Sequence, residues 1–182
     1  MSDYNDSELL ELFRNPESRN FAFNLIIRKY QERIYWHVRR MLICHDDTND
    51  VVQNTFIKVW KGLKGFREES KLYTWLLSIA INESLSFLKK KRIRKFFYLT
   101  DLEKELTHSL ESDVYFEGNE LQQKLQKAIL TLPQKQRLVF NMKYFDNMKY
   151  EDMAEMLGTS TGALKASFHH AVHKIEKYLE DN

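Results

Sequence analysis

The residues with the clearest chemistry are six cations crowded at the end of one predicted helix. They are Lys89, Lys90, Lys91, Arg92, Arg94 and Lys95. Charges at this density cannot be buried together without partners, and complementing a helix macrodipole needs only one or two of them. A phosphate backbone is the commonest partner for such a cluster. The pattern therefore favours binding of a polyanion, with a solvated helix end as the simpler alternative.

A loop just before this helix mixes aromatic and cationic side chains. It carries Phe66, Arg67, Lys71 and Tyr73. Aromatic faces flanked by cations hold unstacked bases, so the loop indicates a single strand of nucleic acid. Ser70 is the predicted N-cap of the helix that follows.

A second candidate for nucleic-acid binding lies near the C-terminus. Ala154 is small where two helices must cross closely, and Gly158 stands where the first helix needs a left-handed residue to end. A second helix begins three residues later, which predicts a helix-turn-helix, although a plain helical hairpin shares these features. The face expected to enter the major groove consists of Gly162, Lys165, Ala166, His169 and His173.

Catalytic chemistry has little support in the sequence. We find no activated nucleophile, glycine-rich phosphate loop or paired carboxylates, so we expect neither enzyme activity nor a cofactor. His169, His173 and Glu176 fall at helical offsets of 0, 4 and 7, a spacing that zinc accepts. Because histidines equally suit a phosphate-facing surface, we expect no metal there.

Composition and charge predict an all-α protein of two small domains. Hydrophobic residues make up 43% of the 182 residues, and five Gly and two Pro are too few for sheets joined by turns. Residues 1–95 hold 18 Lys/Arg against 12 Asp/Glu, residues 96–118 hold 1 against 6, and residues 119–182 hold 9 against 8. This pattern describes a basic helical bundle, an acidic linker and a nearly neutral four-helix domain.

The expected compartment is the cytoplasm. The single cysteine, Cys44, excludes an internal disulfide and fits a reducing environment. The acidic N-terminus lacks an apolar signal core, and the apolar run from Trp75 to Ile81 is too short to cross a bilayer. We therefore expect no direct insertion into a membrane.

Helical periodicity sets the expected boundaries. Residues 7–14 form a short helix capped by Asp6 or Ser7, and a longer helix spans residues 18–43. The third helix follows a polar break and is capped by Thr48 or Asn49. Its inward stripe is Val52, Phe56, Val59, Trp60 and Leu63.

The later helices are delimited in the same way. The helix from Leu72 has apolar residues on two sides, which makes it the expected centre of the bundle. Near the C-terminus, Pro133 is expected to start a helix. The helix before it is lined by Leu121, Leu125, Ile129 and Leu132.

Three motifs, in this order along the chain, resemble those of the extracytoplasmic-function (ECF) sigma factors, the two-domain specificity subunits of bacterial RNA polymerase. They are DDTNDVVQNTFIKVWKGL, FREESKLYTWLLSIAINESLSFLKKKRIRK and the segment from Leu130 to Ile175. The resemblance covers about residues 18–95 and 119–180. It implies a protein that directs core polymerase to promoters. The alternative is an autonomous, dimeric helix-turn-helix repressor.

The resemblance also implies three sets of site residues. Those expected on the polymerase clamp are Asp50, Gln53, Asn54 and Phe56. Those expected on the melted minus-ten strand are Phe66, Arg67, Ser70, Lys71, Tyr73, Asn82, Lys89, Lys90 and Arg92. Those expected on the minus-thirty-five duplex are Ser160, Thr161, Gly162, Lys165, Ala166, His169, His170 and His173.

The implied partners are core polymerase, promoter DNA and an anti-sigma factor, which in this family is often membrane-anchored. Polymerase contact is expected at the clamp of its largest subunit and the flap of its second. The acidic linker either threads the channel later used by RNA or tethers two loosely connected modules. The family usually has an acidic residue at Asn54 and arginines at Ser167 and His170. Binding of the upstream element is therefore expected to depend on histidine protonation.

Overall fold

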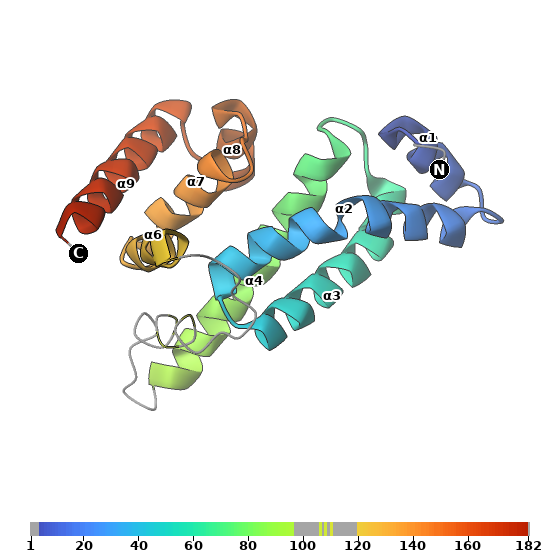
Figure 1. The fold of residues 1–182 in the computed structure, drawn as a ribbon. Coiled ribbons are helices and arrows are strands. Elements are labelled where there is room, and N and C mark those ends of the chain that lie inside the picture. Colours follow the sequence, from blue (N-terminus) through green and yellow to red (C-terminus); the bar gives the residue numbers. More distant parts are fainter. Residues whose placement is uncertain (1–3, 97–105, 107, 109, 111–119, 182) are drawn as a thin grey trace.

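The computed structural model describes residues 4–96, 106, 108, 110 and 120–181, and their regular elements are all helical (Figure 1). The N-terminal unit contains α1 (Asp6–Arg14), α2 (Arg19–Leu42), α3 (His45–Gly62), the 3₁₀ turn η1 (Leu63–Gly65) and α4 (Leu72–Phe96). The C-terminal unit contains α6 (Glu120–Leu130), α7 (Gln134–Tyr144), α8 (Tyr150–Leu157) and α9 (Thr161–Asp181). The predicted all-α fold with two helical units is confirmed.

The N-terminal unit is organised around α2, which packs against α1, α3 and α4. Ile26, Ile34 and Val38 of α2 are fully buried, and so is Leu76 of α4. The sequence predicted α4 as the centre of this bundle. The structure gives that place to α2, because α2 also contacts α1 on one side and α7 on the other.

In the C-terminal unit, α9 packs against α6, α7 and α8. Its Ala171 and Ile175 enter a core with Ile129 and Phe140. Burial on α9 therefore follows the 3.6-residue period of an amphipathic helix. Leu121, which was predicted to point inward, is 66% exposed, because it lies in the first turn of α6, ahead of the buried stretch at the end of that helix.

The start of α1 differs from the prediction. Asn5 is the N-cap, in place of Asp6 or Ser7. Its Oδ1 accepts from the backbone N–H of Glu8 at 3.0 Å, and the Glu8 carboxylate accepts from the Asn5 N–H at 2.7 Å. This reciprocal capping box satisfies two amide groups that the first turn leaves free.

The predicted starts of α3 and α4 also differ from the structure. Helix α3 starts earlier in the chain than predicted, and α4 starts one residue later. Helix α3 begins at His45, because Ile43 makes the turn with a φ of 65° and the helix extends back over the expected polar break. Before α4, the N–H of Trp75 donates to the carbonyl of Lys71 at 3.1 Å. Lys71 is therefore the N-cap of α4, not Ser70.

The two units pack against each other. One apolar cluster extends from the N-terminal core to Leu138, Val139 and Met142 of α7. Two residues of the acidic segment, Leu106 and Leu110, are buried with Ile43 of the N-terminal unit and Leu130 of the C-terminal unit. The expectation of loosely connected modules is wrong for this structure, because apolar side chains from both units share these contacts. The chain ends lie at opposite ends of the molecule (Figure 1).

Candidate nucleic-acid interface

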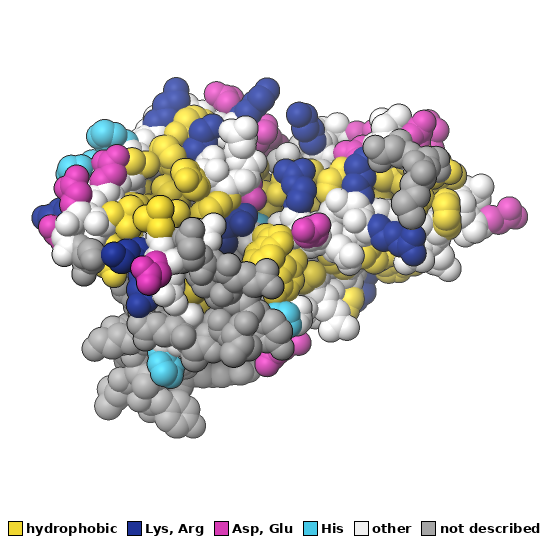
Figure 2. Space-filling model, in the orientation of Figure 1, with side chains coloured by type: hydrophobic (Ala, Val, Ile, Leu, Met, Phe, Trp, Pro, Cys, Tyr) yellow, Lys and Arg dark blue, Asp and Glu magenta, His cyan; other side chains and the backbone are white. Residues whose placement is uncertain are grey.

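The start of α9 presents an exposed polar face, as the sequence predicted. The side chains or backbone of Gly162, Lys165, Ala166, His169 and His173 are all exposed. They recur at helical spacing, so they form one stripe along α9. Ser160 and His170 are exposed beside them, and Thr161 is half-buried. Figure 2 shows Lys and Arg side chains along the upper edge of the molecule, with Asp and Glu side chains among them.

The turn between α8 and α9 fixes how this face is presented. Gly158 ends α8 in the left-handed conformation, with φ 59° and ψ 41°, as predicted. Its N–H donates to the carbonyl of Ala154. Ser160 then caps α9, since its hydroxyl accepts from the N–H of Ala163 at 3.2 Å. The buried residue at the crossing is Met153, at 0% exposure, while Ala154 is half-buried.

The loop before α4 carries Phe66 as a half-buried aromatic residue. Its ring lies 5.0 Å from the ring of Trp75, centroid to centroid. Trp75 is itself half-buried and packs against the core, so it provides a fixed wall behind Phe66. Arg67 and Lys71 are exposed on the same loop, and Ser70 is half-buried.

Glu68, in the middle of this loop, was not predicted as a functional position. Its backbone is left-handed, with a φ of 60°, which is unfavourable for a residue with a Cβ. Its carboxylate pairs with the guanidinium of Arg14 at the end of α1, at 2.5 Å. Both side chains are largely exposed, so the pair contributes at most about 1 kcal/mol. It joins α1 to the loop, which no local sequence pattern could indicate.

The predicted minus-ten residues on α4 do not share one face. Asn82 and Lys89 are exposed and lie seven residues, or about two helical turns, apart on the same side. Tyr73 lies nine residues before Asn82, about two and a half turns, and so projects from the opposite side. The helix therefore groups Asn82 with Lys89 but separates both from Tyr73.

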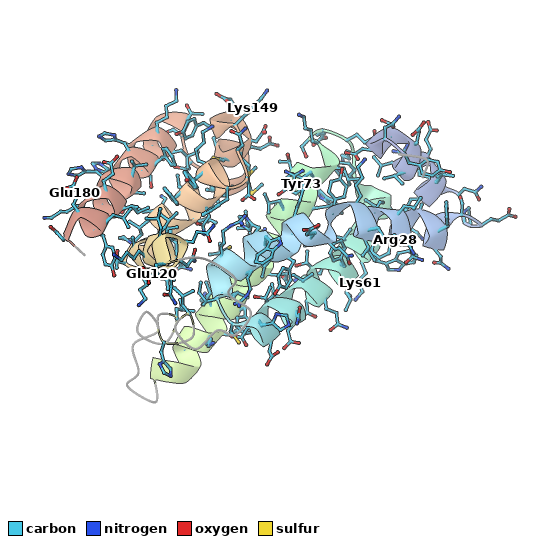
Figure 3. All side chains as sticks on the ribbon, viewed as in Figure 1. Arg28, Lys61, Tyr73, Glu120, Lys149 and Glu180 are labelled. Atoms are coloured by element: carbon cyan, nitrogen blue, oxygen red, sulfur yellow. The ribbon has the colours of Figure 1, made fainter. Side chains whose placement is uncertain are left out.

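Tyr73 faces α2 and the C-terminal unit instead (Figure 3). The guanidinium of Arg33 stands 3.8 Å from the centre of its ring, and Tyr30 stacks on it at 5.9 Å. Its hydroxyl oxygen exposes less than 1 Å². Burial, followed by the nearby carboxylate of Asp146, raises the pKa of Tyr73 to about 12.

The basic end of α4 is only partly free. Lys89 and Lys90 are exposed, whereas Lys91 is half-buried and its Nζ lies 2.7 Å from the carboxylate of Asp47 on α3. The expectation of six unpaired cations is therefore wrong for Lys91, because the extended start of α3 brings an acid beside it. The side chains of Arg92, Arg94 and Lys95 lie outside the part that the structure describes.

The proposed polymerase face of α3 is exposed at Asp50, Gln53 and Asn54. The expectation that Phe56 contacts the polymerase clamp is wrong, because Phe56 is 8% exposed and belongs to the core, as its place in the apolar stripe requires. Ile57 is an exposed apolar residue on this side, at 46% exposure. Sequence periodicity missed it, since an isolated apolar residue on a polar face carries no signal.

Trp60, which was predicted to point inward, is 36% exposed. Its ring packs edge-on against Phe13 at 5.4 Å and Phe23 at 4.9 Å. Trp60 therefore closes the end of the bundle over α1 rather than entering the centre.

None of the helices in the described part of the chain is long and apolar enough to span a bilayer. Among the described residues, no three His, Cys, Asp or Glu side chains are grouped to hold a metal ion.

Residues 26–93 match the family model "Sigma-70 region 2", and residues 122–175 match "Sigma-70, region 4". The chain is 30% identical to the ECF RNA polymerase sigma factor SigW of Bacillus subtilis over 171 residues, covering 88% of this chain and 90% of that one. It is 27% identical to the RNA polymerase sigma-H factor of Pseudomonas aeruginosa, covering 96% and 94%.

Two solved structures share the fold. One is the sigma factor RpoE in complex with the anti-sigma factor NepR from Bartonella quintana, with a TM-score of 0.66, 21% identity, and coverage of 87% of this chain and 96% of that one. The other is CnrH in complex with the cytosolic domain of CnrY, with a TM-score of 0.67, 19% identity, and coverage of 96% of each chain.

The fold and the two matched regions define a sigma-70-type transcription factor. The chain belongs to the ECF sigma factors of bacterial RNA polymerase. Its function is promoter-specific initiation of transcription.

Proposed function

We propose that this chain brings core polymerase to a promoter through two separate DNA contacts. The exposed face of α9 reads the minus-thirty-five duplex, where Lys165 and His169 would donate to phosphates or to purine acceptors. The Phe66 loop holds a base of the melted minus-ten strand. Asn82 and Lys89, on one side of α4, then follow the strand. The observation that carries this proposal is the exposed, acid-free stripe on α9 from Gly162 to His173.

The proposed polymerase contact is the exposed side of α3. Asp50 and Gln53 would meet the clamp of the largest subunit, with Ile57 replacing Phe56 as the apolar contact. The C-terminal unit would meet the flap of the second subunit. We also propose an anti-sigma partner, in keeping with the complexes of the two structural relatives, and action in the cytoplasm, where polymerase and DNA are found. The protein performs no catalysis of its own.

Run-off transcription tests the proposal. Core polymerase should initiate at a defined promoter only when this chain is added. A dimeric repressor would instead occupy duplex DNA without polymerase and direct no initiation, which would refute the proposal.

Two variants separate the roles of the surfaces. Phe66→Ala should impair open-complex formation, detected by permanganate reactivity of unpaired thymines, and should leave core binding unchanged. Gln53→Ala should weaken core binding. If Phe66→Ala abolishes binding to core polymerase instead, the role proposed for the loop is wrong.

A further inference from the structure

The contact between the two units is anchored by one carboxylate. Asp146 lies in the turn between α7 and α8 (residues 145–149), which we call the latch turn. Its Oδ2 lies 2.5 Å from Nδ1 of His37, and its Oδ1 lies 3.3 Å from the guanidinium of Arg40. The side chains of His37 and Asp146 are 0% and 5% exposed. Both partners belong to α2, so a single side chain of the C-terminal unit holds two groups of the N-terminal unit.

Charge and ring contacts surround this carboxylate, although the buried His37 Nε2 and Arg40 Nε have no hydrogen-bond partner among the described residues. Because an ionised carboxylate only accepts hydrogen bonds, Nδ1 of His37 carries the proton and donates it. Burial lowers the pKa of Arg40, and the Asp146 carboxylate opposes that shift. The Arg40 guanidinium also lies 4.3 Å from the centre of the Phe145 ring. Each polar group was taken out of water to form the contact, so loss of one leaves the others uncompensated.

The latch turn is held by hydrogen bonds within the C-terminal unit. Asn147 is left-handed, with a φ of 49°. The N–H of Met148 donates to the carbonyl of Met142 at 3.1 Å, and Lys143 Nζ donates to the carbonyl of Met148 at 3.0 Å. The conformation that projects Asp146 is therefore built into the C-terminal unit.

With the two units packed together, the molecule is too small to reach both promoter elements at once. Elements centred at minus ten and minus thirty-five are 25 base pairs apart, which is roughly 85 Å of B-DNA at 3.4 Å per base pair. A compact chain of 182 residues has a radius of gyration of about 16 Å, hence a diameter of about 40 Å. The docked molecule cannot place α9 and the Phe66 loop on the two elements together.

We infer that the latch turn is an autoinhibitory contact: while Asp146 holds His37 and Arg40, the chain is closed and cannot engage both promoter elements. The inference rests on the proposed function and adds its regulation. In the closed state Tyr73 is covered, because its hydroxyl is buried and lies near Asp146. Docking on core polymerase must separate the units, so polymerase binds the open form.

The Asp146→Asn substitution tests the inference, because it removes the charge and leaves the shape of the side chain nearly unchanged. The Asn amide has one acceptor oxygen for the two donors, His37 and Arg40, so its NH₂ group must face one of them. The ratio of closed to open molecules should therefore fall about tenfold or more. The radius of gyration from small-angle X-ray scattering should rise from about 16 Å to above 20 Å. Apparent affinity for core polymerase should rise by up to the same factor, since it scales with the open fraction.

Glu180→Gln is the matched control. It removes the same charge from an exposed residue at the far end of α9 (Figure 3) and should change neither quantity. Should Asp146→Asn lose its helical circular dichroism, Arg40→Gln gives a second opening variant, with the same two outcomes expected.

The results separate the two proposals. If wild type already has a radius above 20 Å, or if the opening variants change neither radius nor affinity, the latch is refuted while run-off transcription still succeeds. If wild type directs no transcription, the proposed function fails regardless of the radius measured.

Discussion

Gly158 and Gly162 form a matched pair of substitution sites four residues apart in the helix-turn-helix. A Cβ added at either glycine meets no atom within 4 Å. The two positions differ in backbone conformation: Gly158 has a φ of 59°, and Gly162 lies in the first turn of α9. Any difference between the two Gly→Ala variants therefore reports the backbone and not packing.

The expected effects have opposite signs. An alanine in the left-handed conformation costs roughly 1–2 kcal/mol, partly offset by about 0.4–1 kcal/mol from a less flexible unfolded chain. Gly158→Ala should therefore lower the free energy of unfolding by about 1 kcal/mol, or the melting temperature by roughly 2–4 °C for a chain of this size. Gly162→Ala should raise the free energy of unfolding by up to about 1 kcal/mol, since glycine is a poor helix former.

Urea unfolding followed by circular dichroism measures both variants on one scale, with equal m-values as a check that the unfolded states match. The reasoning fails if Gly158→Ala is neutral or stabilising. It also fails if both variants shift the midpoint in the same direction by the same amount.

Three further predictions concern charge. Replacing Lys89 and Lys90 with Gln should make the plot of log affinity for the minus-ten strand against log salt concentration less steep by about 1.4, at about 0.7 per lost phosphate contact. The control Lys61→Gln on α3 should leave this slope unchanged. Equal slopes for wild type and both variants would contradict the role of the cluster. His169→Gln should weaken binding of the isolated minus-thirty-five duplex, because the exposed imidazole is proposed to donate to a phosphate or to a purine acceptor; unchanged affinity would exclude a contribution from His169. Because the pKa of Tyr73 is raised to about 12, its contribution to the free energy of unfolding is complete below pH 10 and is lost as pH rises from 10 to 12. Tyr73→Phe should remove this part of the alkaline loss of stability. If the loss of stability between pH 10 and 12 is the same in wild type and variant, Tyr73 is not buried in solution.

Helical periodicity predicted most of the fold and of the α9 face. The stripe from Leu164 to Ile175 and the left-handed Gly158 both have strong local signals, a 3.6-residue period and a glycine at a helix end. Helix starts were less predictable because several polar residues compete as caps. Asn5 was identified only by the reciprocal bonds with Glu8.

The contact between the units could not be predicted in this way. His37 and Asp146 are 109 residues apart, and each looks like a surface residue when read on its own helix or turn. The sequence likewise predicts Lys91 as part of the basic cluster, because its partner Asp47 belongs to a stretch that the sequence pattern assigns to a break. Long-range ion pairs leave no periodic pattern, so the site was predicted where it is local and missed where it depends on two units meeting.

The burial of Leu106 and Leu110 against both units sets a limit on how far those units can travel. From Leu110 to the start of α6 at Glu120, the backbone reaches at most about 35 Å when fully stretched. Once both leucines leave their contacts with Ile43 and Leu130, the backbone from Phe96 to Glu120 can span at most about 80 Å when fully stretched. Burial of Leu106 and Leu110 therefore limits the separation of the two units. Release of both side chains more than doubles the length of chain that can span between the units.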